Sequence, residues 1–165
     1  MLKGLRSLFI GAVLGILVSI AVFITALRKI ESPKIKEKRT EERKRVFEKW
    51  AVCCRNGRNI DAWAIRHGIR SVIIYGMADI GKSLKKILKN TDIDIYCYDR
   101  NRGISEIDGE TVFHDKKELP MADIAIITVF DPYREIGMEL EKETGIRSVY
   151  FEEILDELMD SRDYI

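Results

Sequence analysis

The eight residues 76–83, GMADIGKS, fit two different phosphate-binding patterns. Written as G-x-x-x-x-G-K-[ST], they match the P-loop, whose backbone cradles the phosphates of a nucleoside triphosphate while the lysine reaches them. Written as G-x-[GA]-x-x-G, they come close to the dinucleotide fingerprint, in which a tight turn and a helix start hold a pyrophosphate. The first pattern predicts a small nucleotide triphosphatase, and the second predicts a protein that binds NAD(P) or a similar ligand.

The segments around this loop favour the dinucleotide pattern. The loop follows an apolar strand-like run, SVIIYG, and a second such run ends at Asp99, near the ~20-residue offset at which dinucleotide folds place the acid for the ribose hydroxyls. Asp79 would put a negative charge inside a P-loop whose N–H groups must hold phosphate. The P-loop stays open as an alternative, because Asp99 or Asp131 follows an apolar strand as a Walker-B aspartate would.

Under the dinucleotide pattern each loop residue has a role. Gly76 makes the tight turn, Ala78 lies where the backbone approaches the pyrophosphate, and Gly81 allows the helix to pack closely on the strand. Asp99 accepts hydrogen bonds from the ribose and repels a 2′-phosphate, which favours NAD over NADP, although the neighbouring Arg100 weakens that preference. The methyl group of Ala78 stands where glycine is usual and disfavours pyrophosphate binding. The predicted cofactor-binding residues are Gly76, Met77, Ala78, Ile80, Gly81, Asp99, Arg100 and Thr128.

The elements that position these residues alternate along the second half of the chain. Short apolar runs rich in β-branched residues predict strands, and segments with apolar residues at helical spacing follow them. We therefore expect an α/β fold with a Rossmann-like parallel sheet of about five strands. Two short helices over 46–69 form a lead-in, with Trp50 and Trp63 on their apolar faces as core residues. The strands are expected at 71–76, 92–99, 110–114, 122–130 and 147–151.

The N-terminal segment 8–27 carries no charge, and its length of about 20 residues is enough for one membrane-spanning helix. A cleaved signal peptide is the alternative. Basic residues are more numerous after this segment than before it, which places the globular part in the cytoplasm, with the chain in the cell membrane as a single-pass protein. The expected organisation is an anchor (1–28), a charged linker (29–45), the helical lead-in (46–69) and the Rossmann-like domain (70–165).

Small residues recur every fourth position along this N-terminal segment. They are Ser7, Gly11, Gly15 and Ser19, and they would form one stripe on a helix. Such a stripe lets a second helix approach closely, which predicts a homodimer, although glycine and serine are also simply common in membrane helices.

Several segments resemble the small Rossmann-type domains found in bacterial surface-polysaccharide and glycan biosynthesis proteins. They are SVIIYGMADIGKSLKKILKNTDIDIYCYDRN, IDGETVF, ADIAIITV and RSVYFEEIL, and the resemblance extends from about Phe47 to Leu158. It implies binding of NAD(P) or a nucleotide-sugar near a membrane, with glycan-biosynthesis enzymes as partners. Gly76, Gly81 and Asp99 match the nucleotide-binding positions of that family, whereas Ala78 departs from its usual glycine.

Other features argue against catalysis and against other ligands. No tyrosine is followed by lysine four positions later, as the Tyr-x-x-x-Lys pair of short-chain dehydrogenases and epimerases requires. A net charge of +1 gives no reason to expect nucleic acid. The three cysteines do not suggest a disulfide framework, and the two histidines are not spaced with them as metal ligands.

The sequence therefore predicts a membrane-anchored module that binds NAD(P) or a nucleotide-sugar, and it favours a non-catalytic role over an enzyme. Two alternatives stay open. One is a Rossmann scaffold without a ligand, which serves protein–protein contacts. The other is the P-loop triphosphatase.

Overall fold

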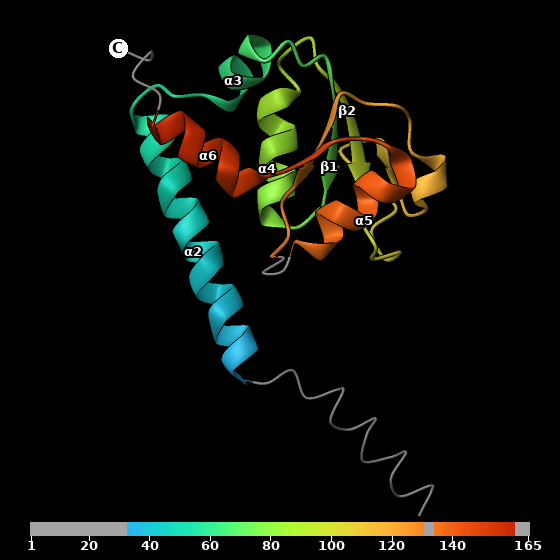
Figure 1. Ribbon diagram of the computed structural model, residues 1–165, viewed down its shortest axis with the longest axis horizontal. Helices are drawn as coiled ribbons and strands as arrows, with labels where there is room; N and C mark the ends of the chain where they lie inside the picture. The colour runs from blue at the N-terminus through green and yellow to red at the C-terminus, as the bar shows by residue number, and fades with distance from the viewer. Residues whose placement is uncertain (1–32, 131–133, 161–165) are drawn as a thin grey trace, which may run out of the picture. The chain divides into compact units, whose positions relative to one another are not determined.

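The structure is a computed structural model that describes residues 33–130 and 134–160 of the chain (Figure 1). The chain divides into two units, 1–41 and 42–165. Of the first unit the structure describes only the beginning of helix α2. The elements are α2 (Pro33–Arg55), α3 (Ile60–Arg66), β1 (Ser71–Tyr75), α4 (Asp79–Leu88), β2 (Asp94–Tyr98), β3 (Glu106–Ile107), β4 (Glu110–Phe113), the 3-10 helix η1 (Lys116–Glu118), β5 (Ile124–Ile127), α5 (Glu135–Thr144), β6 (Ser148–Tyr150) and α6 (Phe151–Asp160).

The second unit is built on a six-stranded sheet with the strand order β3-β4-β2-β1-β5-β6. β1 lies in the centre and pairs in parallel with β2 on one side and with β5 on the other. β4 extends the sheet in parallel beyond β2, and β6 does so beyond β5. The chain therefore moves outwards from β1 to β4 and then returns across β1 to β5, so that the direction of the connections reverses beside β1.

The sheet corrects the expected fold class, because it is mixed and has six strands rather than about five parallel ones. β3 pairs antiparallel with β4 in a hairpin. Asp108 and Gly109 connect the two strands, and both have positive φ angles, 53° and 80°. That backbone is typical of a two-residue hairpin turn, for which Asp-Gly is a favoured sequence.

The expected membrane anchor is the second correction. In the residues that the structure describes, 33–130 and 134–160, no helix is long and apolar enough to cross a membrane. The structure therefore does not support a single-pass protein of the cell membrane with a cytoplasmic domain. Segment 8–27, for which the span was predicted, and the stripe of Ser7, Gly11, Gly15 and Ser19 lie outside the described residues.

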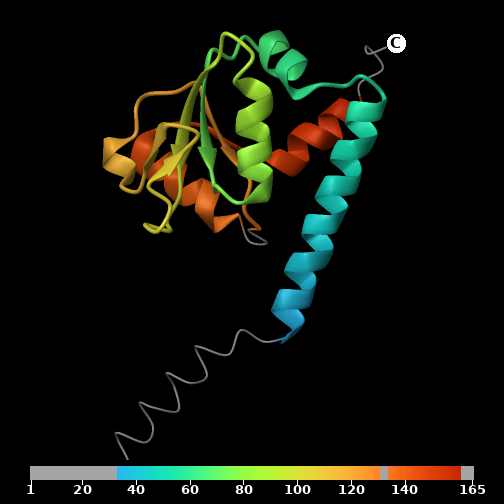
Figure 2. The ribbon, with the colours of Figure 1, turned by 180° about the vertical axis from the view of Figure 1, so that it is seen from behind.

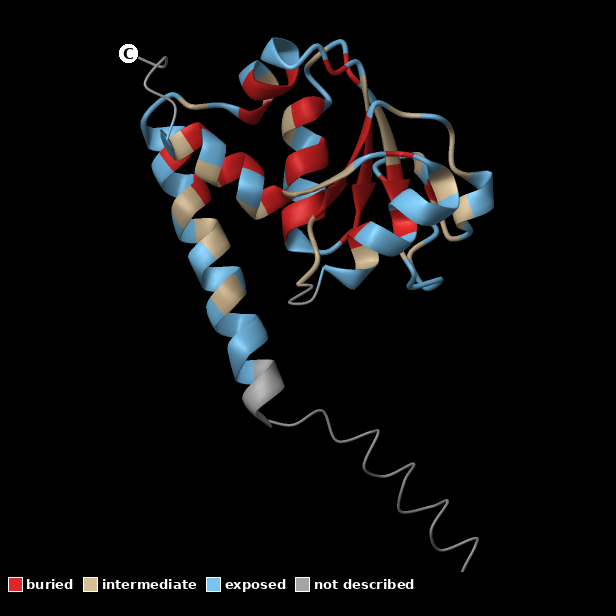
Figure 3. Cartoon of the chain, viewed as in Figure 1, coloured by how far each residue is buried: buried red, intermediate tan, exposed pale blue. Residues whose placement is uncertain are grey.

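Side chains of β1 alternate between two apolar layers, one on each face of the sheet. Figure 3 shows the central strands of the sheet coloured as buried. Val72 and Ile74 face the larger layer, to which α3, α4, α6 and the end of α2 contribute. Ile73 and Tyr75 face the smaller layer, which includes Leu140 of α5. Figures 1 and 2 show α4 and α5 on opposite faces of the sheet. The central strand is thus buried on both faces, as expected for a parallel strand.

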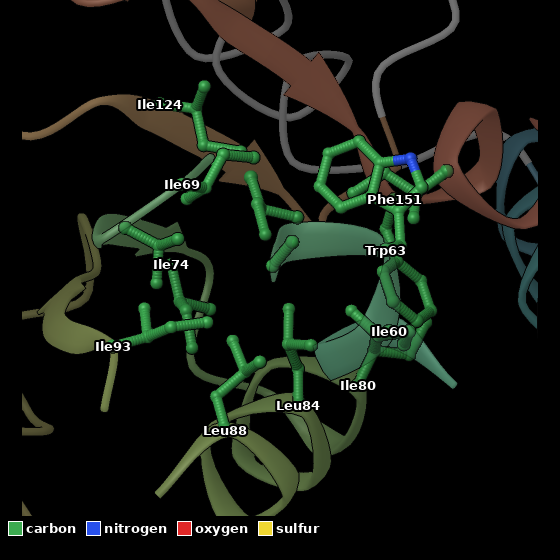
Figure 4. Close-up of a cluster of buried hydrophobic side chains, with 14 of the residues drawn as sticks. Ile60, Trp63, Ile69, Ile74, Ile80, Leu84, Leu88, Ile93, Ile124 and Phe151 are labelled. Atoms are coloured by element: carbon green, nitrogen blue, oxygen red, sulfur yellow. The ribbon is translucent and has the colours of Figure 1, made fainter. Parts of the chain in front are cut away.

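The larger layer contains both tryptophans. Trp50 and Trp63 are 7% and 5% exposed, which confirms their prediction as core residues. Figure 4 shows Trp63 and Ile60 of α3 close to Phe151 and to the apolar side of α4. Trp50 meets Phe151 edge to face, with ring centroids 4.9 Å apart. The lead-in helices are therefore part of the same core as the sheet.

Candidate functional site

The loop between β1 and α4 is only three residues long, 76–78, and Gly76 makes its turn. Gly76 has a φ angle of +99°, which side chains other than glycine rarely adopt. A Cβ atom there would lie 2.3 Å from Cγ1 of Val129. The hydroxyl of Thr128, directly after β5, lies 2.7 Å from the carbonyl oxygen of Gly76 and donates to it. The end of β5 therefore holds the turn in place.

Gly81 allows α4 to pack against this turn. A Cβ atom at Gly81 would lie 2.0 Å from the carbonyl oxygen of Gly76 and 3.2 Å from the hydroxyl oxygen of Thr128. Because the first of these is a backbone atom, no side-chain rotation relieves the contact. The glycine at this position is thus required by the close approach of helix and turn, as the dinucleotide pattern predicts.

Asp99 connects the end of β2 to the same loop. Its Oδ2 accepts a hydrogen bond of 2.7 Å from the backbone N–H of Met77, and its Oδ1 accepts one of 2.8 Å from the N–H of Asn101. The N–H of Gly76 donates to the carbonyl oxygen of Tyr98 over 2.8 Å. The loop and the carboxylate are therefore held in one arrangement at the carboxyl ends of β1 and β2.

The start of α4 does not form the cradle that a P-loop requires. The helix begins at Asp79, so Gly81 and Lys82 belong to its first turns and not to the loop. The N–H groups of Gly76 and Met77 already donate to protein oxygens. Asp79 itself lies at the positive end of the helix dipole, where its carboxylate is 3.4 Å from Arg43. Asp131, the other Walker-B candidate, lies outside the described residues.

The structure brings six of the eight predicted residues together and separates two from them. Gly76, Ala78, Gly81, Asp99 and Thr128 form or border the loop, together with the backbone of Met77, whose side chain is fully buried in the core. The side chain of Ile80 is also buried in the core. Arg100 instead donates to Glu139 of α5 over 2.6 Å.

Two polar side chains near the loop were missed by the sequence reasoning. Tyr75, the last residue of β1, is 3% exposed, and its hydroxyl has no hydrogen-bond partner among the described residues. Burial raises the pKa of Tyr75 to about 12, so the hydroxyl stays neutral. From the sequence, Tyr75 was predicted only to lie in a strand. The residue pattern of a strand does not show which side chains pack against each of its faces.

His114, the other of these two side chains, lies against the end of β2. Its Nδ1 is 2.6 Å from the carbonyl oxygen of Asp99, and its Nε2 is buried without a hydrogen-bond partner among the described residues. In the neutral imidazole, donation from Nδ1 leaves Nε2 as an acceptor. The contact depends on the pairing of β4 with β2, a long-range register that composition does not show.

Arg100 belongs to a cluster of charges on the α5 side of the sheet. Glu139 is 2.6 Å from Arg100 and 2.9 Å from Nζ of Lys116, and Lys116 is also 3.1 Å from Glu143. The hydrogen bond from Lys116 lowers the pKa of Glu139, with a smaller contribution from Arg100. Burial lowers the pKa of Lys116, but the two glutamates outweigh this effect and raise it overall. Glu139 therefore stays ionised and bound by two cations.

Among residues 33–130 and 134–160, no cluster of histidine, cysteine and acidic side chains is arranged to hold a metal ion. The sequence matches no protein-family model, and it matches no curated protein and no solved structure. The site must therefore be interpreted from its own geometry.

Proposed function

We propose that this protein is a nucleotide-binding module that takes NAD or a nucleotide-sugar at the loop after β1, with Asp99 as the acceptor for the ribose. The observation that carries the proposal is the position of the Asp99 carboxylate, held 2.7 Å from the N–H of Met77 at the carboxyl ends of two neighbouring parallel strands. In open α/β sheets, ligands bind at this edge, where the direction of the connections reverses. Here the reversal lies beside β1.

The carboxylate of Asp99 has the capacity to bind a diol while it holds the loop. An ionised carboxylate offers roughly four acceptor positions. The N–H groups of Met77 and Asn101 occupy two of them. The remaining positions suit the two adjacent hydroxyls of a ribose, which are hydrogen-bond donors. The loop contacts thus fix the orientation of the carboxylate without using all of its acceptor capacity.

The part of the site that would bind phosphate is less favourable than in a loop with glycine at all three positions of the pattern. The first N–H groups of α4 have no acceptor within the helix and would face a pyrophosphate. Ala78 and Asp79 are both exposed at this helix start. The methyl of Ala78 limits close approach, and the charge of Asp79 opposes that of a phosphate. We therefore expect the ribose to contribute more to affinity than the pyrophosphate does.

The proposed module binds its ligand without turning it over, because the chain has no Tyr-x-x-x-Lys pair for proton transfer. The resemblance to domains of bacterial glycan biosynthesis proteins supports a nucleotide-sugar as the ligand and glycan-biosynthesis enzymes as the partners. Both assignments are part of the proposal.

A ligand-free scaffold for protein contacts is the second candidate function. It is favoured because polar groups of the loop already have hydrogen-bond partners within the protein. Both oxygens of Asp99 accept backbone N–H groups, and Asp79 occupies the helix start with Arg43 beside it. The two candidates differ in one observable property, which is whether a nucleotide binds.

Isothermal titration calorimetry of the full chain with NAD, ADP-ribose, UDP-glucose and Mg-ATP distinguishes these functions. The proposal predicts saturable binding of NAD, ADP-ribose or UDP-glucose, and a loss of at least about tenfold in affinity in Asp99→Asn, since a hydrogen bond to a charged acceptor contributes about 1.5–3 kcal/mol. Asp94→Asn is the matched control, because Asp94 is exposed at the opposite end of the same strand.

Two results would contradict the proposal. Folded protein that binds none of the four ligands supports the scaffold. Binding of Mg-ATP alone, lost in Lys82→Ala and kept in Asp99→Asn, supports the P-loop instead. Thermal unfolding of each variant, measured alongside, shows that the substitutions leave the fold intact.

A further inference from the structure

Arg100 directly follows Asp99, the proposed ribose acceptor, in the chain, but its side chain is bound to helix α5. Its guanidinium donates to Oε2 of Glu139 over 2.6 Å. The guanidinium carbon also lies 6.0 Å from the ring centroid of Tyr75, at the limit of a cation–π contact. The positive charge beside Asp99 is therefore neutralised by α5.

Glu139 is well placed to hold Arg100, because its carboxylate also forms an ion pair with a second cation. Its Oε1 is 2.9 Å from Nζ of Lys116. The side chain of Lys116 is 9% exposed, and its ammonium group pairs with both Glu139 and Glu143. Lys116 keeps Glu143 at 3.1 Å if Glu139 is neutralised. A neutral residue at position 139 would thus release Arg100 and leave Lys116 with a partner.

The charge at this point decides which nucleotides fit beside Asp99. A carboxylate favours a ribose with a free 2′-hydroxyl and repels a 2′-phosphate, whereas a nearby arginine accommodates the phosphate. Arg100 directly follows Asp99 in the chain. As long as Glu139 neutralises Arg100, the carboxylate acts alone on the 2′ position.

We propose that Glu139 is a specificity-determining residue of the nucleotide site: by holding Arg100 on α5, it excludes nucleotides that carry a 2′-phosphate. The inference rests on the proposed nucleotide-binding function and refines it to ligands with a free 2′-hydroxyl. Glu139 acts through Arg100, so it is a positioning residue and does not itself touch the ligand.

Calorimetry of the full chain with NAD and NADP tests this role. We expect the wild type to bind NAD at least about tenfold more tightly than NADP. Glu139→Gln is expected to raise the affinity for NADP about fivefold and leave that for NAD unchanged. The gain is modest because the ion pair that holds Arg100 is about half exposed, and such pairs are worth up to about 1 kcal/mol. The double variant Glu139→Gln with Arg100→Ala is expected to lose this gain.

Glu143→Gln is the matched control. Glu143 lies on the same helix as Glu139 and also pairs with Lys116. The ion pair of Arg100, however, is with Glu139. Equal gains in Glu143→Gln and Glu139→Gln, or a gain that persists without Arg100, would show a general charge effect and overturn the inference. NAD binding that depends on Asp99, with NADP affinity unchanged in Glu139→Gln, would overturn the inference alone. Failure of both nucleotides to bind any variant would overturn the inference, whereas the proposed function would fall only if UDP-glucose also failed to bind.

Discussion

The backbone N–H of Met77 and the carboxylate of Asp99 are joined by a hydrogen bond of 2.7 Å, although 22 positions separate the two residues in the chain. This bond connects the turn after β1 to the end of β2. Because β1 and β2 are parallel neighbours, their carboxyl ends lie at the same edge of the sheet. The geometry of the proposed site therefore depends on the sheet.

Gly81→Ala is expected to destabilise the protein by about 1–3 kcal/mol, as overpacking in a tight interior does. The added Cβ atom would meet the carbonyl oxygen of Gly76 at 2.0 Å, and only a shift of α4 away from the turn would relieve it. Urea unfolding measures the change. Gly103→Ala is the control, because its nearest neighbour is an oxygen of the Asn101 side chain at 3.2 Å. Equal stability of the two variants would contradict the packing described.

Glu110→Gln is expected to cost more stability than Lys85→Met, about 2–3 kcal/mol against about 1 kcal/mol. The side chain of Lys85 is completely buried, 3.1 Å from Glu110, and donates to the carbonyl oxygen of Ile107. Neutralising Glu110 leaves a buried ammonium group without its counter-ion. Removing the lysine instead leaves a glutamate that is 41% exposed and remains hydrated.

Urea unfolding of both variants measures this difference. A larger loss in Lys85→Met would mean that the contact of the lysine with the β3–β4 hairpin matters more than the buried charge.

Tyr75→Phe is expected to leave stability unchanged or to raise it by up to about 1 kcal/mol. The hydroxyl of Tyr75 is buried and has no hydrogen-bond partner among the described residues, so its removal relieves a desolvation cost. Thermal and urea unfolding of the two proteins provide the measurement. A loss of more than about 1 kcal/mol would show that the hydroxyl has a partner in solution, and would make Tyr75 a candidate contact for a ligand.

Asp123 is expected to stabilise the fold in a pH-dependent way. The N–H groups of Arg70 and Ser71 donate to its Oδ2, and these bonds lower its pKa below the ordinary value of 3.8. A carboxyl group whose pKa is lowered on folding contributes stability above its ordinary pKa, and this contribution is lost as the pH falls through the folded pKa. The stability difference between wild type and Asp123→Asn should therefore be largest near pH 6 and shrink below about pH 4. Urea unfolding over pH 3–6 measures it, and a difference that does not change with pH would be inconsistent with this role.

The elements around the loop could be predicted from sequence because their signals are local. Continuous apolar, β-branched runs predicted strands at 71–76 and 122–130, and the structure has β1 and β5 there. The short strand β3 was missed, since two residues are too few to show a period. Its signal was the Asp108–Gly109 pair, which is typical of a hairpin turn. The membrane-spanning helix is not supported by the part of the chain that the structure describes.

The geometry of the loop could be predicted where a residue type reports on backbone conformation. Gly76 and Gly81 are needed at a positive φ angle and at a close backbone approach, and glycine spacing reveals both requirements. The direction of Arg100 could not be predicted, because it is set by Glu139, 39 residues away on α5. The fully buried side chain of Met77 could not be predicted either, since a loop position does not show which layer lies beneath it.

The most direct test of the proposed function is to titrate the ¹⁵N-labelled full chain with NAD, and separately with UDP-glucose, and to follow its backbone amide resonances by NMR. We expect saturable shifts that concentrate at the loop and helix start, 76–81, and at 99–101. The amides of Ser71 and Asp94, at the opposite ends of β1 and β2, should stay in place. Absence of shifts with both NAD and UDP-glucose at millimolar concentration, or shifts confined to a surface away from the loop, would contradict the assignment of this loop as a nucleotide site.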